Sequence, residues 1–103
     1  MNESTDSLVR YNAESAFYHA KFIVNGPFPA GEATIAKDPF FAYRYAATIL
    51  NSPFPAGEPA ISNDGYCSMC YARDVLKKPF PAGEPAISQL SIYKAKYDKL
   101  FNR

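Results

Sequence analysis

The sequence predicts an all-α protein, a short solenoid of αα-hairpin repeats with a 26-residue period and a C-terminal capping helix. Three observations predict this fold. The segment Pro-Phe-Pro-Ala-Gly-Glu occurs three times at a constant interval, at residues 27–32, 53–58 and 79–84. Small, aromatic and apolar residues between these segments recur at helical spacing. A fixed period of this length is typical of repeat architectures.

Each long helix is predicted from its N-cap to the following proline. Asp38 is a good N-cap because its carboxylate accepts from the free amides of the first turn, and Pro39 suits the first helical position. Asn12 and Asp64 hold the cap position one repeat away. Because the residue before a proline avoids helical torsions, we expect long helices over about 13–25, 39–51 and 65–77.

After each long helix, the proline-rich segment predicts an extended turn and a short helical turn. Glu58 and Glu84 are favoured there by the N-terminal helix dipole, and Phe54 and Ile61 are expected to fill the space under the long helix. The predicted units are about 12–36, 37–62 and 63–88, with a cap at 89–103, in one domain over 1–103. The cap contains a helix from about 90 to 101 that is more polar, as a terminal repeat should be.

Two sets of repeated positions predict the packing. Small residues recur at 16, 42 and 68 and again at 20, 46 and 72, where neighbouring helices are expected to approach closely. Rings recur at His19, Tyr45, Tyr71 and Tyr97. A ring with a polar tip suits a half-buried packing position, so we expect His19 to pack rather than to catalyse.

The composition fits one modest globular domain. The chain has 103 residues and a net charge of +1, so no strong field attracts nucleic acid or a membrane. No apolar run approaches the ~20 residues of a membrane span, and residues 1–10 lack the apolar core of a secretory signal. We expect a cytoplasmic protein, in the host cell cytoplasm if it is encoded by a phage.

Cys67 and Cys70 form the one motif that resembles a chemical site. Near a helix N-terminus a C-x-x-C pair can be redox-active, and two thiolates can supply half of a zinc site. No strand precedes the motif, and the chain has one histidine. The favoured interpretation is that both cysteines replace Phe41 and Arg44 of the previous repeat at surface or half-buried positions.

No constellation of catalytic residues is recognisable. Glu32, Glu58 and Glu84 are separated by the repeat rather than brought to one cleft, so stabilisation of helix N-termini explains them better than acid–base chemistry. There is no phosphate loop, nucleophile elbow or metal cluster. We therefore expect no enzyme activity, no cofactor and no metal.

The repeat also resembles a known type. Asp-Pro-x-x-Ala-Tyr-x-Tyr-Ala followed by Pro-Phe-Pro-Ala-Gly-Glu-Pro-Ala-Ile is similar to a short helical repeat of tailed bacteriophages and some large viruses, over about residues 12–88. The first unit departs from it at Ala33-Thr34 and His19, and the third at Gly65 and the two cysteines. The resemblance implies a small accessory protein that binds and disables a host enzyme or a defence complex, such as a CRISPR or other immune-system inhibitor.

A variable stripe on the long helices is the predicted partner-binding surface. Aromatic and basic residues anchor protein interfaces, and this stripe carries Tyr18, Lys21, Phe40, Phe41, Arg44, Tyr66, Arg73, Lys77, Tyr93 and Lys96, with Glu14, Phe22 and Lys99 beside them. The favoured function is inhibition or redirection of a host protein complex by surface occlusion. The alternatives are single-stranded nucleic-acid binding by the same stripe and a solvated face without function. A homodimer is compatible with the sequence.

Overall fold

The computed structural model describes residues 12–102, and these residues are helical or in turns, with no strand among them. Three long helices each consist of an α segment and a π segment. They are α2 (Ala13–His19) with η1 (Ala20–Val24), α4 (Pro39–Arg44) with η2 (Tyr45–Leu50), and α6 (Gly65–Tyr71) with η4 (Ala72–Leu76). The last helix, α8 (Ser91–Leu100), is α-helical throughout.

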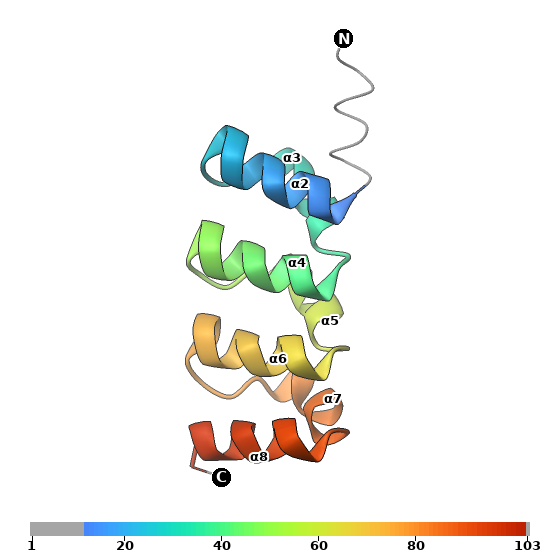
Figure 1. Cartoon of the computed structure of the whole chain (residues 1–103), viewed down its shortest axis with the longest axis vertical. Helices are drawn as coiled ribbons and strands as arrows, with labels where there is room; N and C mark the ends of the chain where they lie inside the picture. The colour runs from blue at the N-terminus through green and yellow to red at the C-terminus, as the bar shows by residue number, and fades with distance from the viewer. Residues whose placement is uncertain (1–11, 103) are drawn as a thin grey trace.

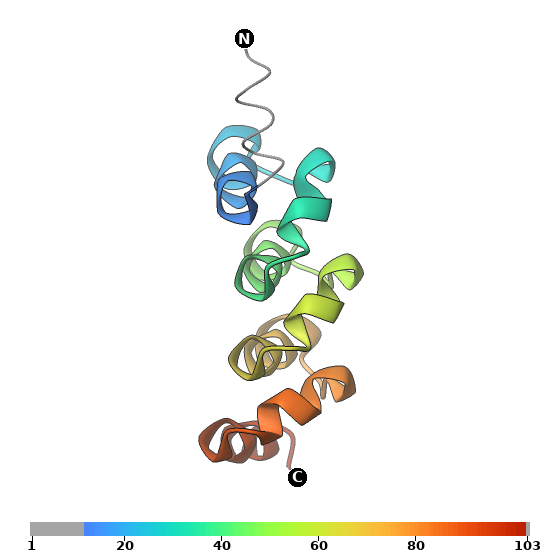
Figure 2. The same cartoon turned by 90° about the vertical axis from the view of Figure 1, so that its right-hand side faces the viewer.

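Short helices follow each of the first three long ones. They are α3 (Pro29–Ile35), then η3 (Pro55–Gly57) with α5 (Glu58–Ile61), then η5 (Pro81–Gly83) with α7 (Glu84–Ser88). The long helices lie side by side in chain order in one layer, and the short helices form a second layer behind them (Figures 1 and 2). The molecule is elongated along this row, with extents of 52 × 22 × 18 Å.

The N-caps of the three long helices, and Pro39 at the start of α4, are confirmed. The Asp38 carboxylate accepts from the Phe41 amide at 3.0 Å, and the Asp64 carboxylate accepts from the Cys67 amide at 2.8 Å. Asn12 caps α2 in the same way. Each cap satisfies a backbone donor that has no partner within its own helix.

The ends of the long helices differ slightly from the prediction. The π segments end at Val24, Leu50 and Leu76. The next residue of each is left-handed: Asn25, Asn51 and Lys77 have φ of 60°, 53° and 57°. The Lys77 amide donates to the Ala72 carbonyl at 2.7 Å, a bond one residue wider than the α pattern. The chain therefore reverses at a left-handed residue before it reaches the proline, and the proline alone does not locate the stop.

The small residues lie where helix and turn approach each other. Ala42 is fully buried, and a Cβ added to Gly57 would lie 2.8 Å from the Ala42 Cβ. The same relation holds one repeat later, where a Cβ on Gly83 would lie 2.5 Å from the Cβ of Ser68. Phe54, Ile61 and their mates Phe80 and Ile87 are buried under the long helices, as predicted.

A tyrosine of each later long helix bonds to the turn of the unit before it. The Tyr71 hydroxyl donates to Glu58 Oε2 at 2.7 Å and accepts from the Phe54 amide at 2.9 Å. Tyr45 makes the same two bonds to Glu32 and the Phe28 amide, and Tyr97 makes them to Glu84 and the Phe80 amide. Each glutamate lies in the first turn of its own short helix, as predicted, and its carboxylate also binds the next long helix.

The last helix, α8, differs from the other long helices at the positions where their following turns pack. Lys94 and Asp98 occupy the two small-residue positions of the repeat, and they form an i,i+4 ion pair at 2.7 Å. Phe101 packs edge-on against Tyr97 at a ring distance of 5.1 Å, the place that Phe80 takes beside Tyr71 at 5.2 Å. The prediction of a more polar terminal helix over about 90–101 is confirmed to within one residue at each end.

Candidate functional site

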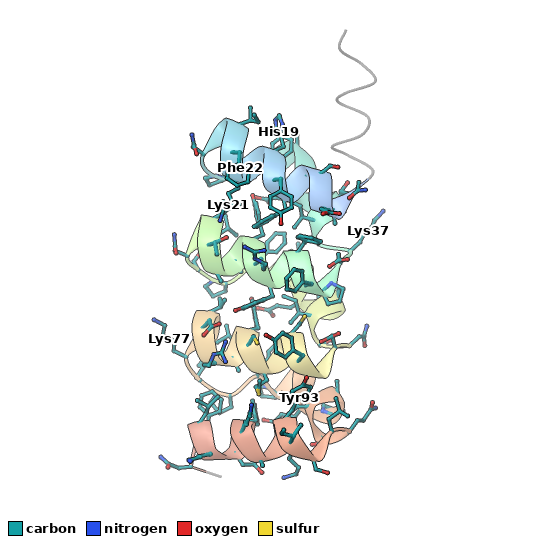
Figure 3. The ribbon with its side chains drawn as sticks, in the orientation of Figure 1. His19, Lys21, Phe22, Lys37, Lys77 and Tyr93 are labelled. Carbon is teal, nitrogen blue, oxygen red and sulfur yellow. The ribbon has the colours of Figure 1, made fainter. Side chains whose placement is uncertain are left out.

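Exposed hydrophobic side chains gather on one side of the long helices. Nine large hydrophobic residues are exposed in the described part of the chain, and six of them occupy three equivalent positions of the long helices. These six define what we call the front face, and they are Tyr18, Phe22, Phe40, Tyr66, Ile92 and Leu100. Phe22, labelled in Figure 3, lies on the first long helix of this face. Grouped exposed apolar side chains mark interaction sites more often than scattered single residues do.

The first half of the front face is an aromatic cluster between α2 and α4. The Tyr18 ring stacks on Phe22 at 5.8 Å and meets Phe41 edge-on at 6.1 Å. Phe41 in turn contacts Phe17 at 5.6 Å and Phe40 at 5.1 Å. Phe17 is fully buried, whereas Phe22 is 64% and Phe40 is 41% exposed, so the cluster runs from the core to the surface.

Two cations lie over this aromatic cluster. The Arg44 guanidinium lies 5.1 Å from the Phe17 ring centre and 5.6 Å from that of Phe40. The Lys21 ammonium lies 5.9 Å from the Phe22 ring centre. Rings hold such cations in place by cation–π attraction without neutralising their charge. The cluster therefore presents rigid rings and positive charge together.

The second half of the front face is a groove of about 670 Å³ between α6 and α8. Tyr66 and Tyr93 line it with ring centres 5.7 Å apart, and Met69 and Leu100 supply apolar surface. Arg73, Lys96 and Lys99 are its charged residues, and no carboxylate lines it. We refer to it as the basic groove.

A hydrogen-bonded network of side chains lies between the aromatic cluster and the basic groove. Arg73 pairs with Asp74 through Nε at 2.7 Å and Nη2 at 2.9 Å, and the Tyr43 hydroxyl of α4 also donates to Asp74. The Arg73 guanidinium holds the pKa of the Asp74 carboxyl below its usual range. Burial, followed by the bond to Asp74, raises the pKa of Tyr43. This network joins α4 to α6 and interrupts the positive charge of the front face.

The structure places nine of the ten predicted partner-binding residues in these two regions. Tyr18, Lys21, Phe40, Phe41 and Arg44 belong to the aromatic cluster, and Tyr66, Arg73, Tyr93 and Lys96 line the basic groove. Lys77 lies apart, in the left-handed reversal at the end of η4 (Figure 3). Ile92, Leu100 and Met69 were not predicted as part of the binding surface. The 26-residue register offered a signal for two of them: Ile92 is equivalent to Tyr66, and Leu100 is equivalent to Phe22.

The prediction for the cysteine pair is wrong in its location. Cys67 is 3% and Cys70 is 1% exposed, so both are buried rather than at the surface. Phe41 and Arg44, at the equivalent positions one repeat earlier, are half-buried. Burial raises the pKa of the Cys67 thiol to about 12 and raises that of Cys70. Both are free thiols, and a raised pKa disfavours the thiolate that redox and metal chemistry need.

His19, the remaining polar candidate, has a packing role. The His19 ring lies 4.7 Å from Phe28, half-buried at the first end of the row (Figure 3).

Over residues 12–102, no group of three or more histidine, cysteine or acidic side chains is placed to hold a metal ion. In the same part of the chain no helix has the length and apolarity of a membrane span.

Comparison with known proteins gives no further guide. Searches of family models, of curated proteins and of solved structures return no match to this chain.

Proposed function

We propose that this chain is a helical solenoid of 26-residue αα-hairpin units, and that its front face binds a protein partner. Support for the repeat organisation comes from contacts that recur with the sequence period. The tyrosine-to-turn bonds recur at Tyr45, Tyr71 and Tyr97, and the glycine-to-helix contacts recur at Gly31, Gly57 and Gly83. Stacked units of this kind bury one side and present an extended surface on the other.

The observation that carries the binding function is the grouping of exposed rings with cations on the front face. A monomer gains nothing in stability from exposing Phe22 or Phe40. Aromatic and arginine side chains dominate the energetics of protein interfaces. Arg44 is held over the rings and is ordered before binding, which lowers the entropy cost of association.

The partner that we propose is a host protein or protein complex, and the effect is inhibition or redirection by surface occlusion. The resemblance to a repeat of bacteriophage accessory proteins supports this choice, and an anti-defence role in the host cytoplasm follows from it. In this proposal the front face binds its partner without catalysing a reaction, because its aromatic and cationic side chains include no pair of a nucleophile and a general base. No cofactor is needed.

A second candidate function is binding of single-stranded nucleic acid. Tyr66 and Tyr93 with Lys96 and Lys99 resemble the combination of stacking rings and bases used for that purpose. Two carboxylates argue against it. Asp74 forms an ion pair with Arg73, and the exposed Glu14 adds a second negative charge to the same face. Strand binding needs a continuous basic track, which this arrangement interrupts.

The test is affinity capture of the tagged protein's partner from nuclease-treated host lysate, followed by measurement of the purified pair. The double variant Phe22→Ala/Phe40→Ala removes two exposed rings and leaves the buried Phe17 and the half-buried Phe41 in place. We expect it to weaken partner binding by at least about tenfold, since aromatic side chains that anchor an interface cost ~2 kcal/mol or more when truncated.

The matched control is Ile23→Ala/Leu90→Ala, which removes two exposed hydrophobic residues that lie off the front face. The control should bind as the unaltered protein does. Equal loss in both variants would point to a different surface. Recovery of nucleic acid alone, before nuclease treatment, would favour the second candidate.

A further inference from the structure

We propose that the basic groove between α6 and α8 binds an acidic peptide segment of the partner, one that carries an aliphatic side chain among its carboxylates. This inference rests on the proposed function, because it assigns a chemistry to one half of the front face. It goes beyond it by naming what the groove recognises.

Charge complementarity is the first argument. The groove has three cationic side chains and no carboxylate in its lining. Arg73 is bound by Asp74, whereas Lys96 and Lys99 form no ion pair within residues 12–102. Lys94, on the same helix, is paired with Asp98 and lines a different hollow. The two lysines left with free ammonium groups on α8 are thus the two that face the groove.

The apolar lining is the second argument. Met69 forms part of the groove although it is almost fully buried, and Leu100 is exposed beside it. The rings of Tyr66 and Tyr93 line the same groove. An anion that binds only through charge would leave this apolar surface in water, whereas an aliphatic side chain would cover it. The volume of about 670 Å³ lies within the ~300–1,000 Å³ of ordinary ligand pockets and suits a few side chains.

The limited extent of the groove favours a peptide over a nucleic acid strand. Its lining comes from α6, η4 and α8, and the pairing of Arg73 with Asp74 separates it from the cations over the aromatic cluster. A phosphate backbone carries a charge at every nucleotide and needs bases at matching intervals. A short acidic segment needs charge only at one place.

The experiment titrates the protein with short capped peptides and follows the methyl resonance of Met69 by NMR. The chain has two methionines, so the signal is simple to assign. The probes are a glutamate–leucine peptide, the same peptide with glutamine for glutamate, the same peptide with alanine for leucine, and an oligothymidylate of similar length. We expect the glutamate–leucine peptide to shift the Met69 methyl most strongly. The two altered peptides should bind with an affinity at least about tenfold lower.

The charge-reversal variant is Lys96→Glu/Lys99→Glu, and its matched control is Lys37→Glu/Lys78→Glu. Both change the net charge equally at exposed positions, and Lys37 lies on a connecting turn away from the groove (Figure 3). We expect the first to lose about tenfold or more in affinity for the glutamate–leucine peptide and the control to lose little, apart from a long-range effect that salt screens.

Equal affinity for the glutamine peptide, tighter binding of oligothymidylate, or an unmoved Met69 methyl would overturn this inference. These results are distinguishable from failure of the proposed function. If Phe22→Ala/Phe40→Ala loses the captured partner while no peptide binds the groove detectably, the front face binds a protein and the groove assignment is wrong. If neither variant affects the captured partner, both proposals fail.

Discussion

The Tyr71 hydroxyl and the Glu58 carboxylate lie 2.7 Å apart, across 13 residues of sequence and between two successive units. The same hydroxyl accepts from the Phe54 amide at 2.9 Å. One side chain therefore satisfies a buried backbone donor and a carboxylate of the preceding turn. The buried tyrosine thus provides a polar link between the proline-rich turn and the next long helix.

The first prediction removes this link. Tyr71→Phe keeps the ring but leaves the Phe54 amide without its acceptor, and an unsatisfied buried donor costs ~1–3 kcal/mol. We expect the free energy of unfolding in urea to fall by about that amount, with the ring packing on Phe80 retained. Tyr93→Phe is the control, because its hydroxyl forms no comparable bond to a turn. Equal stability of the two variants would show that the link contributes nothing.

The second prediction concerns alkaline pH. Burial, followed by the bond to Glu32, raises the pKa of Tyr45 from 10.0 to about 12. The folded state therefore favours the protonated hydroxyl, and this stabilisation is fully present below pH 10.0 and is lost as pH rises to about 12. Tyr71 also has a raised pKa, for the same reasons. We expect urea unfolding at increasing pH to show a loss of stability in this window.

The variant Tyr45→Phe isolates that effect from the titration of lysines. Below pH 10.0 it should be less stable than the unaltered protein, and the difference should shrink as the pH approaches 12. A difference that stays constant with pH would mean that the folded protein does not hold this proton.

Much of the fold follows from the sequence because its signals are local. Asp38 and Pro39 define a helix start with their own side chains, and the constant interval between proline segments defines the chain order of the elements. The tyrosine-to-glutamate bonds did not follow, because they join residues of different helices whose mutual distance depends on how those helices pack. The left-handed residue before each proline was missed too, since Lys77 carries no sequence signal for that conformation.

The candidate site was predicted in part for similar reasons. The aromatic and basic character of Tyr18, Arg44 and Tyr66 can be read from composition and helical spacing. The burial of Cys67 and Cys70 could not, because it depends on the reach of side chains from neighbouring helices. The division of the stripe into a cluster and a groove depends on the pairing of Arg73 with Asp74, which is a matter of rotamer geometry.

The third prediction tests the close contact of turn and helix. A Cβ at residue 57 would lie 2.8 Å from the Ala42 Cβ and 2.7 Å from a ring carbon of Phe54. Gly57→Ala should therefore overpack this contact and cost ~1–3 kcal/mol. Gly26→Ala is the control, since nothing lies within 4 Å of its added Cβ and its φ is not positive. Thermal unfolding should separate the two variants, and equal melting temperatures would contradict the packing.

The fourth prediction concerns the thiols. With its pKa raised to about 12, Cys67 is almost entirely protonated near pH 8, and little solvent reaches either cysteine. We expect alkylation by iodoacetamide to be slow in the folded protein and fast in urea, as measured by mass spectrometry. Rapid labelling of the native protein, or bound zinc in its native mass spectrum, would restore the redox or metal interpretation.

The last prediction separates a structural residue from the binding surface. Lys77 is left-handed with φ of 57°, a conformation that costs a residue with a Cβ ~1–2 kcal/mol and costs glycine little. Lys77→Gly should therefore gain stability, offset in part by the greater freedom of glycine in the unfolded chain. Because Lys77 lies apart from the aromatic cluster and the basic groove, partner binding should be unchanged. A melting temperature above that of the unaltered protein, with equal affinity, is the expected pair of results. Loss of affinity in a stable Lys77→Gly variant would extend the binding surface to the helix ends.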